Sequence, residues 1–306
     1  MTPRIATDRD AKAGPMCTCS IPHLLPRRLA LAVVGTLVLT ACEGTFTGDL
    51  ASDRPGDPEI AEINTTLLGL EFEKSGGGTD TLEFTDGEPV DLMDFVDGTP
   101  MRVFTDEPLS SGTYTGVRLL FDDDADVIVV DTAGVEFEGT LAEGEFADLS
   151  FTVEDDDRSQ ESFTLALDLR RSLVFDDTTD DYTLTPVLRA VRSEDAADVG
   201  GTVDIDCPSG TTLAEGGAVY VFAGQDIVPD DLDGAGVEPY ATTLVTTGTG
   251  TTDPLYRVRV LPPGTYTLAA TCRGDEDVLD ADDDLQFQRI RNVTLDDGES
   301  LDFDLD

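Results

Sequence analysis

The sequence predicts an all-β protein in which two consecutive β-sandwich domains follow a lipoprotein signal peptide and a flexible tether. Three observations support this prediction. An apolar segment ends in Leu39-Thr40-Ala41-Cys42, short runs beyond it alternate apolar and polar residues, and clusters of Gly, Asp and Pro separate those runs. Many short strands divided by regular turn signals are typical of sandwiches and barrels.

The N-terminal segment, residues 1–41, has the parts of a bacterial lipoprotein signal peptide in the right order. Arg27 and Arg28 supply a basic region, and the apolar run of 11 residues that follows, Leu29–Leu39, is too short to span a bilayer. The next residues resemble the lipobox, in which small residues precede the cysteine that is lipidated. We therefore expect export, cleavage before Cys42, lipidation of Cys42 and attachment to the cell envelope. Glu43 rather than Asp follows, which favours the outer membrane, on its periplasmic or surface face.

Composition divides the exported chain into three parts. Residues 42–58 are rich in Gly, Asp, Ser and Pro, and are expected to form the lipidated, flexible tether. Residues 59–192 are expected to form the first β-sandwich domain and residues 199–306 the second. Within the first, every second residue of Phe163–Leu169 is Phe or Leu, and this period of two predicts a strand with one buried face.

Four motifs occur in order in the first predicted domain: PVDLMDF (89–95), LSSGTYTGVRLLFD (109–122), FTLALDLRRSLV (163–174) and YTLTPVLRAV (182–191). They resemble a bacterial lipoprotein family whose central domain is known only as domain of unknown function 4382. The resemblance covers about residues 59–192. It implies a β-sandwich in a surface lipoprotein, and it offers no catalytic residues.

The second predicted domain contains Gly201-Thr202-Val203, Ala218-Val219-Tyr220-Val221 and LPPGTYTLAA (261–270). These motifs resemble a carboxypeptidase-regulatory or transthyretin-like sandwich, also described as immunoglobulin-like. The resemblance implies an accessory or binding module. The Asp-rich segment 274–284 departs from the pattern of that family.

The charge of the chain limits its partners. It has 64 acidic residues against 19 Lys and Arg, and cleavage before Cys42 would leave a formal charge of −48. Nucleic acid is excluded as a partner because phosphate binding needs clustered basic residues. Cations, an envelope protein or a polysaccharide are the candidate partners, and the membrane is reached through the lipid anchor. A halophilic or marine habitat also explains the acidity, because salt screens repulsion.

The residue types argue against catalysis. The one histidine, His23, lies in the signal peptide, which removes Ser-His-Asp and Cys-His nucleophile systems and the usual zinc ligand. Lys74 precedes Ser75-Gly76-Gly77-Gly78, which indicates a solvated turn. A pair of carboxylates suffices for some hydrolases, but so many are present that their occurrence is uninformative. We predict no enzyme, with a carboxylate-based hydrolase as an alternative.

Two thiols remain beyond Cys42, namely Cys207 and Cys272. In an oxidising compartment two remaining thiols favour a disulfide, the alternative being two free cysteines.

Two acidic loops could supply the oxygen ligands that calcium needs. The candidate ligands are Asp230, Asp231, Asp233, Asp280, Asp282 and Asp284. The first loop lacks the full calcium-loop pattern and its closing Glu. Solvated acidic surface is therefore an equally open interpretation, and no other cofactor is expected.

Together these observations predict a membrane-anchored, non-enzymatic binding or structural module of the envelope. A calcium-dependent carbohydrate- or matrix-binding module is the first alternative. The carboxylate-based hydrolase is the second.

Overall fold

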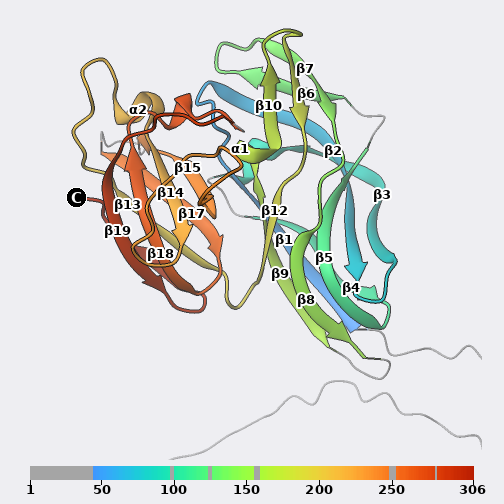
Figure 1. Ribbon diagram of the computed structural model, residues 1–306. Coiled ribbons are helices and arrows are strands. Elements are labelled where there is room, and N and C mark those ends of the chain that lie inside the picture. Colours follow the sequence, from blue (N-terminus) through green and yellow to red (C-terminus); the bar gives the residue numbers. More distant parts are fainter. Residues whose placement is uncertain (1–43, 97–99, 123–125, 155–158, 248–252, 280) are drawn as a thin grey trace, which may run out of the picture. The chain divides into compact units, whose positions relative to one another are not determined.

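The structure, a computed structural model, describes residues 44–306 except residues 97–99, 123–125, 155–158, 248–252 and 280 (Figure 1). The described residues form strands joined by short helical turns, which confirms the predicted all-β class. The helical segments are three or four residues long, and none in this part of the chain could cross a membrane. They are η1 (Leu92–Phe95), α1 (Leu169–Ser172), α2 (Leu213–Gly216) and η2 (Gly274–Glu276).

The first β region, strands β1 to β12, contains two sheets that share one hydrophobic core. The smaller sheet has the order β12-β9-β1-β4, with β12 (Leu188–Arg192), β9 (Gln160–Asp168), β1 (Gly44–Asp53) and β4 (Met101–Leu109). The larger follows β10-β11-β7-β6-β2-β5-β8, with β3 paired to β2. Its strands are β10 (Leu173–Asp176), β11 (Asp181–Leu184), β7 (Glu136–Leu141), β6 (Val127–Asp131), β2 (Ile60–Lys74), β5 (Gly112–Phe121), β8 (Ala147–Val153) and β3 (Thr79–Asp91).

The prediction of a flexible tether over residues 42–58 was wrong for most of its length. Residues 44–53 form strand β1, which lies between β9, parallel to it, and β4, antiparallel to it. Phe46 and Leu50 are fully buried, and the Phe46 ring lies 4.8 Å from that of Phe72 and 6.2 Å from that of Phe163. The Gly, Asp and Ser content concealed a period-two pattern that buries alternate residues.

Hydrogen-bond pairing sets the strand boundaries at two further places. The run 182–192 forms two strands, β11 and β12, because Pro186 lies in the stretch between them and cannot donate a ladder hydrogen bond. In the second region a strand occupies Ala197–Thr202, where it pairs with neighbours on both sides.

The second β region, coloured from yellow-orange to red in Figure 1, has two four-stranded sheets around a second core. One sheet has the order β16-β17-β13-β20, with β16 (Thr246–Thr247), β17 (Pro254–Leu261), β13 (Ala197–Thr202) and β20 (Ser300–Asp302). The other has the order β15-β14-β18-β19, with β15 (Ala241–Leu244), β14 (Ala218–Ala223), β18 (Gly264–Thr271) and β19 (Phe287–Leu295).

A small apolar cluster joins the two regions. Ala51, Ala166 and Val191 of the first region's smaller sheet pack with Val260 of β17. Val260 has a φ of 55°, which is unusual for a β-branched residue, and it lies beside a register shift between β13 and β17. Such irregularities redirect a side chain, and here Val260 packs against the first region rather than its own core. The described residues from Gly44 onward accordingly belong to one compact unit.

Candidate functional site

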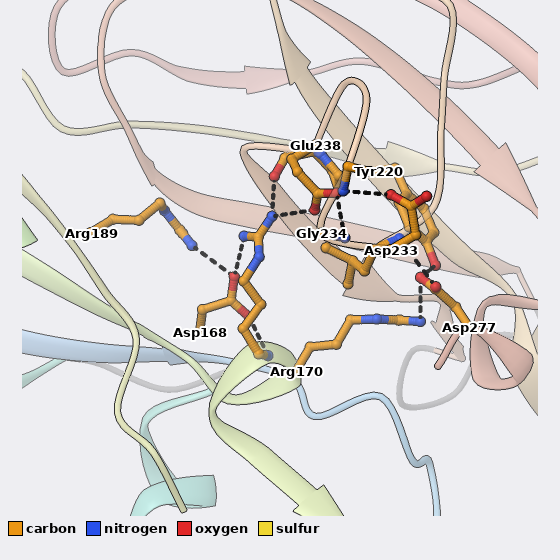
Figure 2. Close-up of polar contacts among 12 residues, drawn as sticks. Asp168, Arg170, Arg189, Tyr220, Asp233, Gly234, Glu238 and Asp277 are labelled. Atoms are coloured by element: carbon orange, nitrogen blue, oxygen red, sulfur yellow. Dashed lines mark hydrogen bonds and ion pairs between the residues drawn. The ribbon is translucent and has the colours of Figure 1, made fainter. Parts of the chain in front are cut away.

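The polar contacts between the two β regions centre on three arginines of the first region, Arg170, Arg171 and Arg189. Together with the carboxylates that they contact, Asp53, Asp168 and Asp277, we call them the ionic layer. Figure 2 labels four of its members, Asp168, Arg170, Arg189 and Asp277. In the parallel pairing of β1 and β9, Asp53 lies level with Asp168, which places two carboxylates side by side. Arg189 comes from β12, the neighbour of β9 in the sheet.

Arg189 lies between these two carboxylates. Its Nη1 is 2.5 Å from Asp53 Oδ2 and 4.0 Å from Asp168 Oδ2, and all three residues are buried. Burial disfavours the charge of Arg189, but the charge and the hydrogen bond of Asp53 outweigh it and raise the Arg189 pKa. The other end of the guanidinium crosses to the second region, where Nη2 donates to the carbonyl of Arg259 at 3.0 Å.

Arg171 makes the second contact between the two β regions. Asp168 caps the short helix α1 by accepting from the Arg171 N–H at 3.1 Å, and the Arg171 Nη1 lies 2.8 Å from the same carboxylate. The free end of Arg171 donates to the carbonyl of Pro239 and lies 3.9 Å from Glu238 Oε2. Local helix capping therefore orients a side chain that binds the other region.

Arg170 makes the third contact between the two β regions and is the most buried of the three arginines. Its Nη2 donates to the Gly274 carbonyl and lies 3.0 Å from Asp277 Oδ2, which also accepts from the Tyr220 hydroxyl. Burial, together with the charge of Asp277, raises the pKa of Tyr220, so this hydroxyl stays a donor. Arg170 Nε and Nη1 are buried and have no hydrogen-bond partner among the residues that the structure describes.

The carboxylates that the structure brings together differ from the predicted calcium ligands. Oxygens of Asp231, Asp277 and Asp283 lie within 4.8 Å of one another. Of the six predicted ligands only Asp231 belongs to this group. Asp280 lies outside the described residues, and the others, which are not in the group, are Asp230, Asp233, Asp282 and Asp284.

Hydrogen bonds already engage each member of this acidic group. Asp231 accepts from the Asp283 N–H, Asp283 from the Val278 N–H at 2.7 Å, and Asp277 from the Leu232 N–H at 3.2 Å. Burial raises the pKa of Asp231, and the neighbouring negative charge of Asp277 raises it further. A cation could relieve this repulsion, and calcium would need further oxygens, from backbone carbonyls or water, beside those of the three carboxylates.

A cleft of about 650 Å³ lies beside the ionic layer, within the usual size of small-ligand sites. Arg170 is part of its lining, and both β regions contribute to it. The apolar side chains of the first region, which we call the apolar wall, are Phe137, Leu173, Val174, Phe175 and Tyr182. Other lining residues are Asp57, Glu59, Glu215, Asp275, Asp277, Val278 and Leu279.

The cysteine predictions have different outcomes. Cys207 and Cys272 form a disulfide with their α-carbons 5.7 Å apart, as predicted. Cys42 lies outside the described residues, so its lipidation stays a prediction.

The interface arginines were not singled out from the sequence. A signal for them existed, because Arg170-Arg171 directly follows a buried strand in a chain with few basic residues. Basic residues beside a buried strand in an acidic chain need carboxylate partners if they are to be buried.

Comparison with known proteins identifies part of the chain. Residues 44–186 match the family model described as domain of unknown function (DUF4382). The chain therefore carries a DUF4382 domain, as its motifs predicted, and this domain begins with strand β1 rather than at residue 59. The transthyretin-like character of residues 199–306 stays a prediction, and no curated protein matches the chain.

Three solved structures are distantly similar, each with a TM-score of 0.20. The Bacillus anthracis TIE protein is 8% identical, and the match covers 85% of this chain and 33% of that one. A candidate cell adhesion protein of Bacteroides fragilis is 10% identical, with 85% and 92% covered. A fimbrial protein of Bacteroides ovatus is 9% identical, with 87% and 49% covered. The chain thus spans about a third of the Bacillus protein, and likenesses at this level assign no function.

Proposed function

We propose that this chain is a lipid-anchored envelope protein that works as a rigid, non-enzymatic binding module. The observation that carries the proposal is the cleft beside the ionic layer, because both β regions contribute its walls. A binding site built from two regions keeps its shape only if the regions are fixed to each other. Three guanidinium groups, two of them buried, and the cluster around Val260 supply that fixation.

The start of the fold supports direct anchoring. Strand β1 begins at Gly44, two positions after Cys42, and two residues span at most ~7 Å. A lipid on Cys42 would therefore hold the first β region against the bilayer surface instead of at the end of a tether. The Cys207–Cys272 disulfide agrees with an oxidising compartment such as the envelope.

A binding role fits the residues around the cleft better than catalysis. The chain beyond the signal segment contains no histidine. Asp277 is held by Arg170 and by the hydroxyl of Tyr220, and it is fully buried. These contacts hold the two β regions together, and this structural role explains why charged residues are buried here.

Membrane fractionation of a Gram-negative host that expresses the full chain tests the anchor. The wild-type protein should partition with membranes and incorporate labelled palmitate, and Cys42→Ala should do neither. Ser75→Ala, which changes a small exposed residue far from the signal segment in the chain, is the matched control and should keep both properties. Palmitate incorporation that survives the loss of Cys42 would refute this part of the proposal.

Calcium binding is a second candidate, favoured by the proximity of Asp231, Asp277 and Asp283. Titration with calcium, followed by the thermal midpoint, should then show saturable stabilisation that magnesium does not reproduce. Asp231→Asn should abolish the effect, whereas Asp284→Asn, outside the group, should retain it. A midpoint that responds equally to both cations would indicate screening alone.

A further inference from the structure

We propose that the cleft binds an extended peptide in which apolar and basic side chains alternate, and that this peptide lies along the free edge of strand β10. The inference rests on the proposed function and gives the binding module the chemical class of its partner. Four independent features of the cleft support it: a free strand edge, exposed apolar side chains, unpaired buried donors and an acidic rim.

The first feature is the edge of β10. This strand ends the larger sheet, and among the described residues it pairs only with β11. Leu173, Val174 and Phe175 all line the cleft although they are consecutive. Successive side chains of a strand point to opposite faces, so a cleft that meets all three runs along the edge rather than over one face. Edge strands present unpaired N–H and C=O groups, and these bind extended peptides by adding a strand.

The second feature is the exposure of apolar side chains at the cleft. Val174, Phe175 and Val278 are 47%, 42% and 58% exposed. They are three of the seven exposed large hydrophobic residues in the described part of the chain. In so acidic a protein, apolar side chains gathered at a cleft indicate a surface that another molecule covers.

The third feature is Arg170. Its Nε and Nη1 atoms are buried without an acceptor among the described residues, and its side chain is only 3% exposed. Buried donors are normally hydrogen-bonded. A peptide that runs along β10 carries carbonyl oxygens at regular intervals, and one of these can accept from the guanidinium group at the cleft.

The fourth feature is the charge of the rim. Asp57, Glu59, Glu215 and Asp275 are exposed and line the cleft, whereas the charge of Arg170 is matched by Asp277. Partial desolvation of its carboxyl group raises the pKa of Asp275, and the charge of Glu276 beside it adds to the effect. Basic side chains would relieve this repulsion, and their aliphatic stems can lie against Phe175. An acidic peptide would be excluded.

Binding of a fluorescent peptide in which lysine and valine alternate, measured by anisotropy with the full lipidated chain in detergent, tests the proposal. The expected result is saturable binding, with no binding of the matched peptide that has glutamate in place of lysine. Val278→Ser should weaken binding at least ~tenfold, because burial of a valine is lost. Val228→Ser is the matched control, since Val228 is 80% exposed and does not line the cleft, and should leave affinity unchanged.

Charge reversal provides a second, independent variant. Glu59→Lys should weaken binding ~fivefold or more, and the difference should shrink in molar salt. Glu107→Lys, which reverses an exposed charge on β4 away from the cleft, should not weaken binding. Equal effects of Val278→Ser and Val228→Ser, equal binding of the glutamate peptide, or no saturable binding would each overturn the proposal.

These outcomes are separate from those of the proposed function. Membrane attachment and palmitate labelling are measured on the same preparation. Failed peptide binding with intact attachment defeats only the partner proposed here. Lost attachment with intact peptide binding defeats only the lipid anchor.

Discussion

Arg189 Nη1 and Asp53 Oδ2 lie 2.5 Å apart, although 136 positions separate the two residues in the chain. The contact depends on the position of β1, because Asp53 is the last residue of that strand and lies level with Asp168 of β9. Arg189 pairs with Asp53, lies 4.0 Å from Asp168 and, through the Arg259 carbonyl, also holds the second β region. One buried side chain thus links the N-terminal strand, the first sheet and the interface.

Arg189→Met should lower the free energy of unfolding by about 3–5 kcal/mol, because it leaves Asp53 buried without its partner. Urea denaturation measures the loss. Arg102→Met is the matched control, since Arg102 is 53% exposed and pairs with Asp49 at the surface. Its cost should stay within about 1 kcal/mol. Similar losses in the two variants would contradict a buried ion pair.

The double variant Asp53→Asn with Arg189→Met separates repulsion from packing. It removes the unpaired charge, so it should recover part of the stability that Arg189→Met alone loses. If the double variant were less stable than both the wild type and Arg189→Met, the ion pair would contribute through packing and not through charge.

Removal of the disulfide should destabilise the second β region strongly. The bridge closes a loop with a sequence separation of 65, for which the chain-entropy model gives an upper figure of about 4 kcal/mol. Cys207→Ala with Cys272→Ala should therefore lower the thermal midpoint by several degrees, and reductant should do the same to the wild type only. Thiols that can be alkylated in the unreduced, folded protein would contradict the bridge.

The all-β class and many strands could be predicted because alternation and turn residues are local signals. Strand β1 could not, because its Gly, Asp and Ser residues are typical of a linker, and its strand partners β4 and β9 come much later in the chain. Tertiary pairing overrode a weak local preference at this position. The Cys207–Cys272 disulfide could be predicted because only two thiols remain beyond Cys42 and the expected compartment is oxidising. That argument does not depend on knowing how far apart the two residues lie in the fold.

The ionic layer could not be predicted from spacing. Asp53, Asp168 and Arg189 meet only when three strands adopt one register, and Asp277 belongs to the other region. The calcium prediction grouped Asp residues that are close in sequence within each loop, whereas the fold places Asp231 next to Asp277 and Asp283 through loop conformation. Composition also gave no indication of the apolar wall at β10.

Stability should increase with salt because net repulsion dominates at a formal charge of −45. Sodium chloride shortens the Debye length from about 8 Å at physiological strength to about 3 Å at 1 M. Thermal midpoints should rise over that range and continue to rise, without saturating at low concentration. A flat or falling midpoint would show that screened attractive pairs outweigh the repulsion.

The pH dependence of stability should carry a contribution from Asp231. Burial, aided by the charge of Asp277, raises its pKa above the ordinary 3.8. The folded protein then binds this proton more tightly than the unfolded chain. The contribution of Asp231 to stability therefore rises as pH falls through the raised pKa, until the unfolded chain is protonated as well.

Asp231→Asn keeps an oxygen that can accept from the Asp283 N–H but removes the charge. It should stabilise the protein at neutral pH, and this advantage should shrink as pH falls toward about 4. Asp304→Asn is the opposite control, because hydrogen bonds from the Thr202 N–H and hydroxyl lower the Asp304 pKa. That variant should lose stability at neutral pH and approach the wild type in acid. Unfolding free energies at several pH values measure both trends, and an Asp231→Asn advantage that grows in acid would contradict the raised pKa.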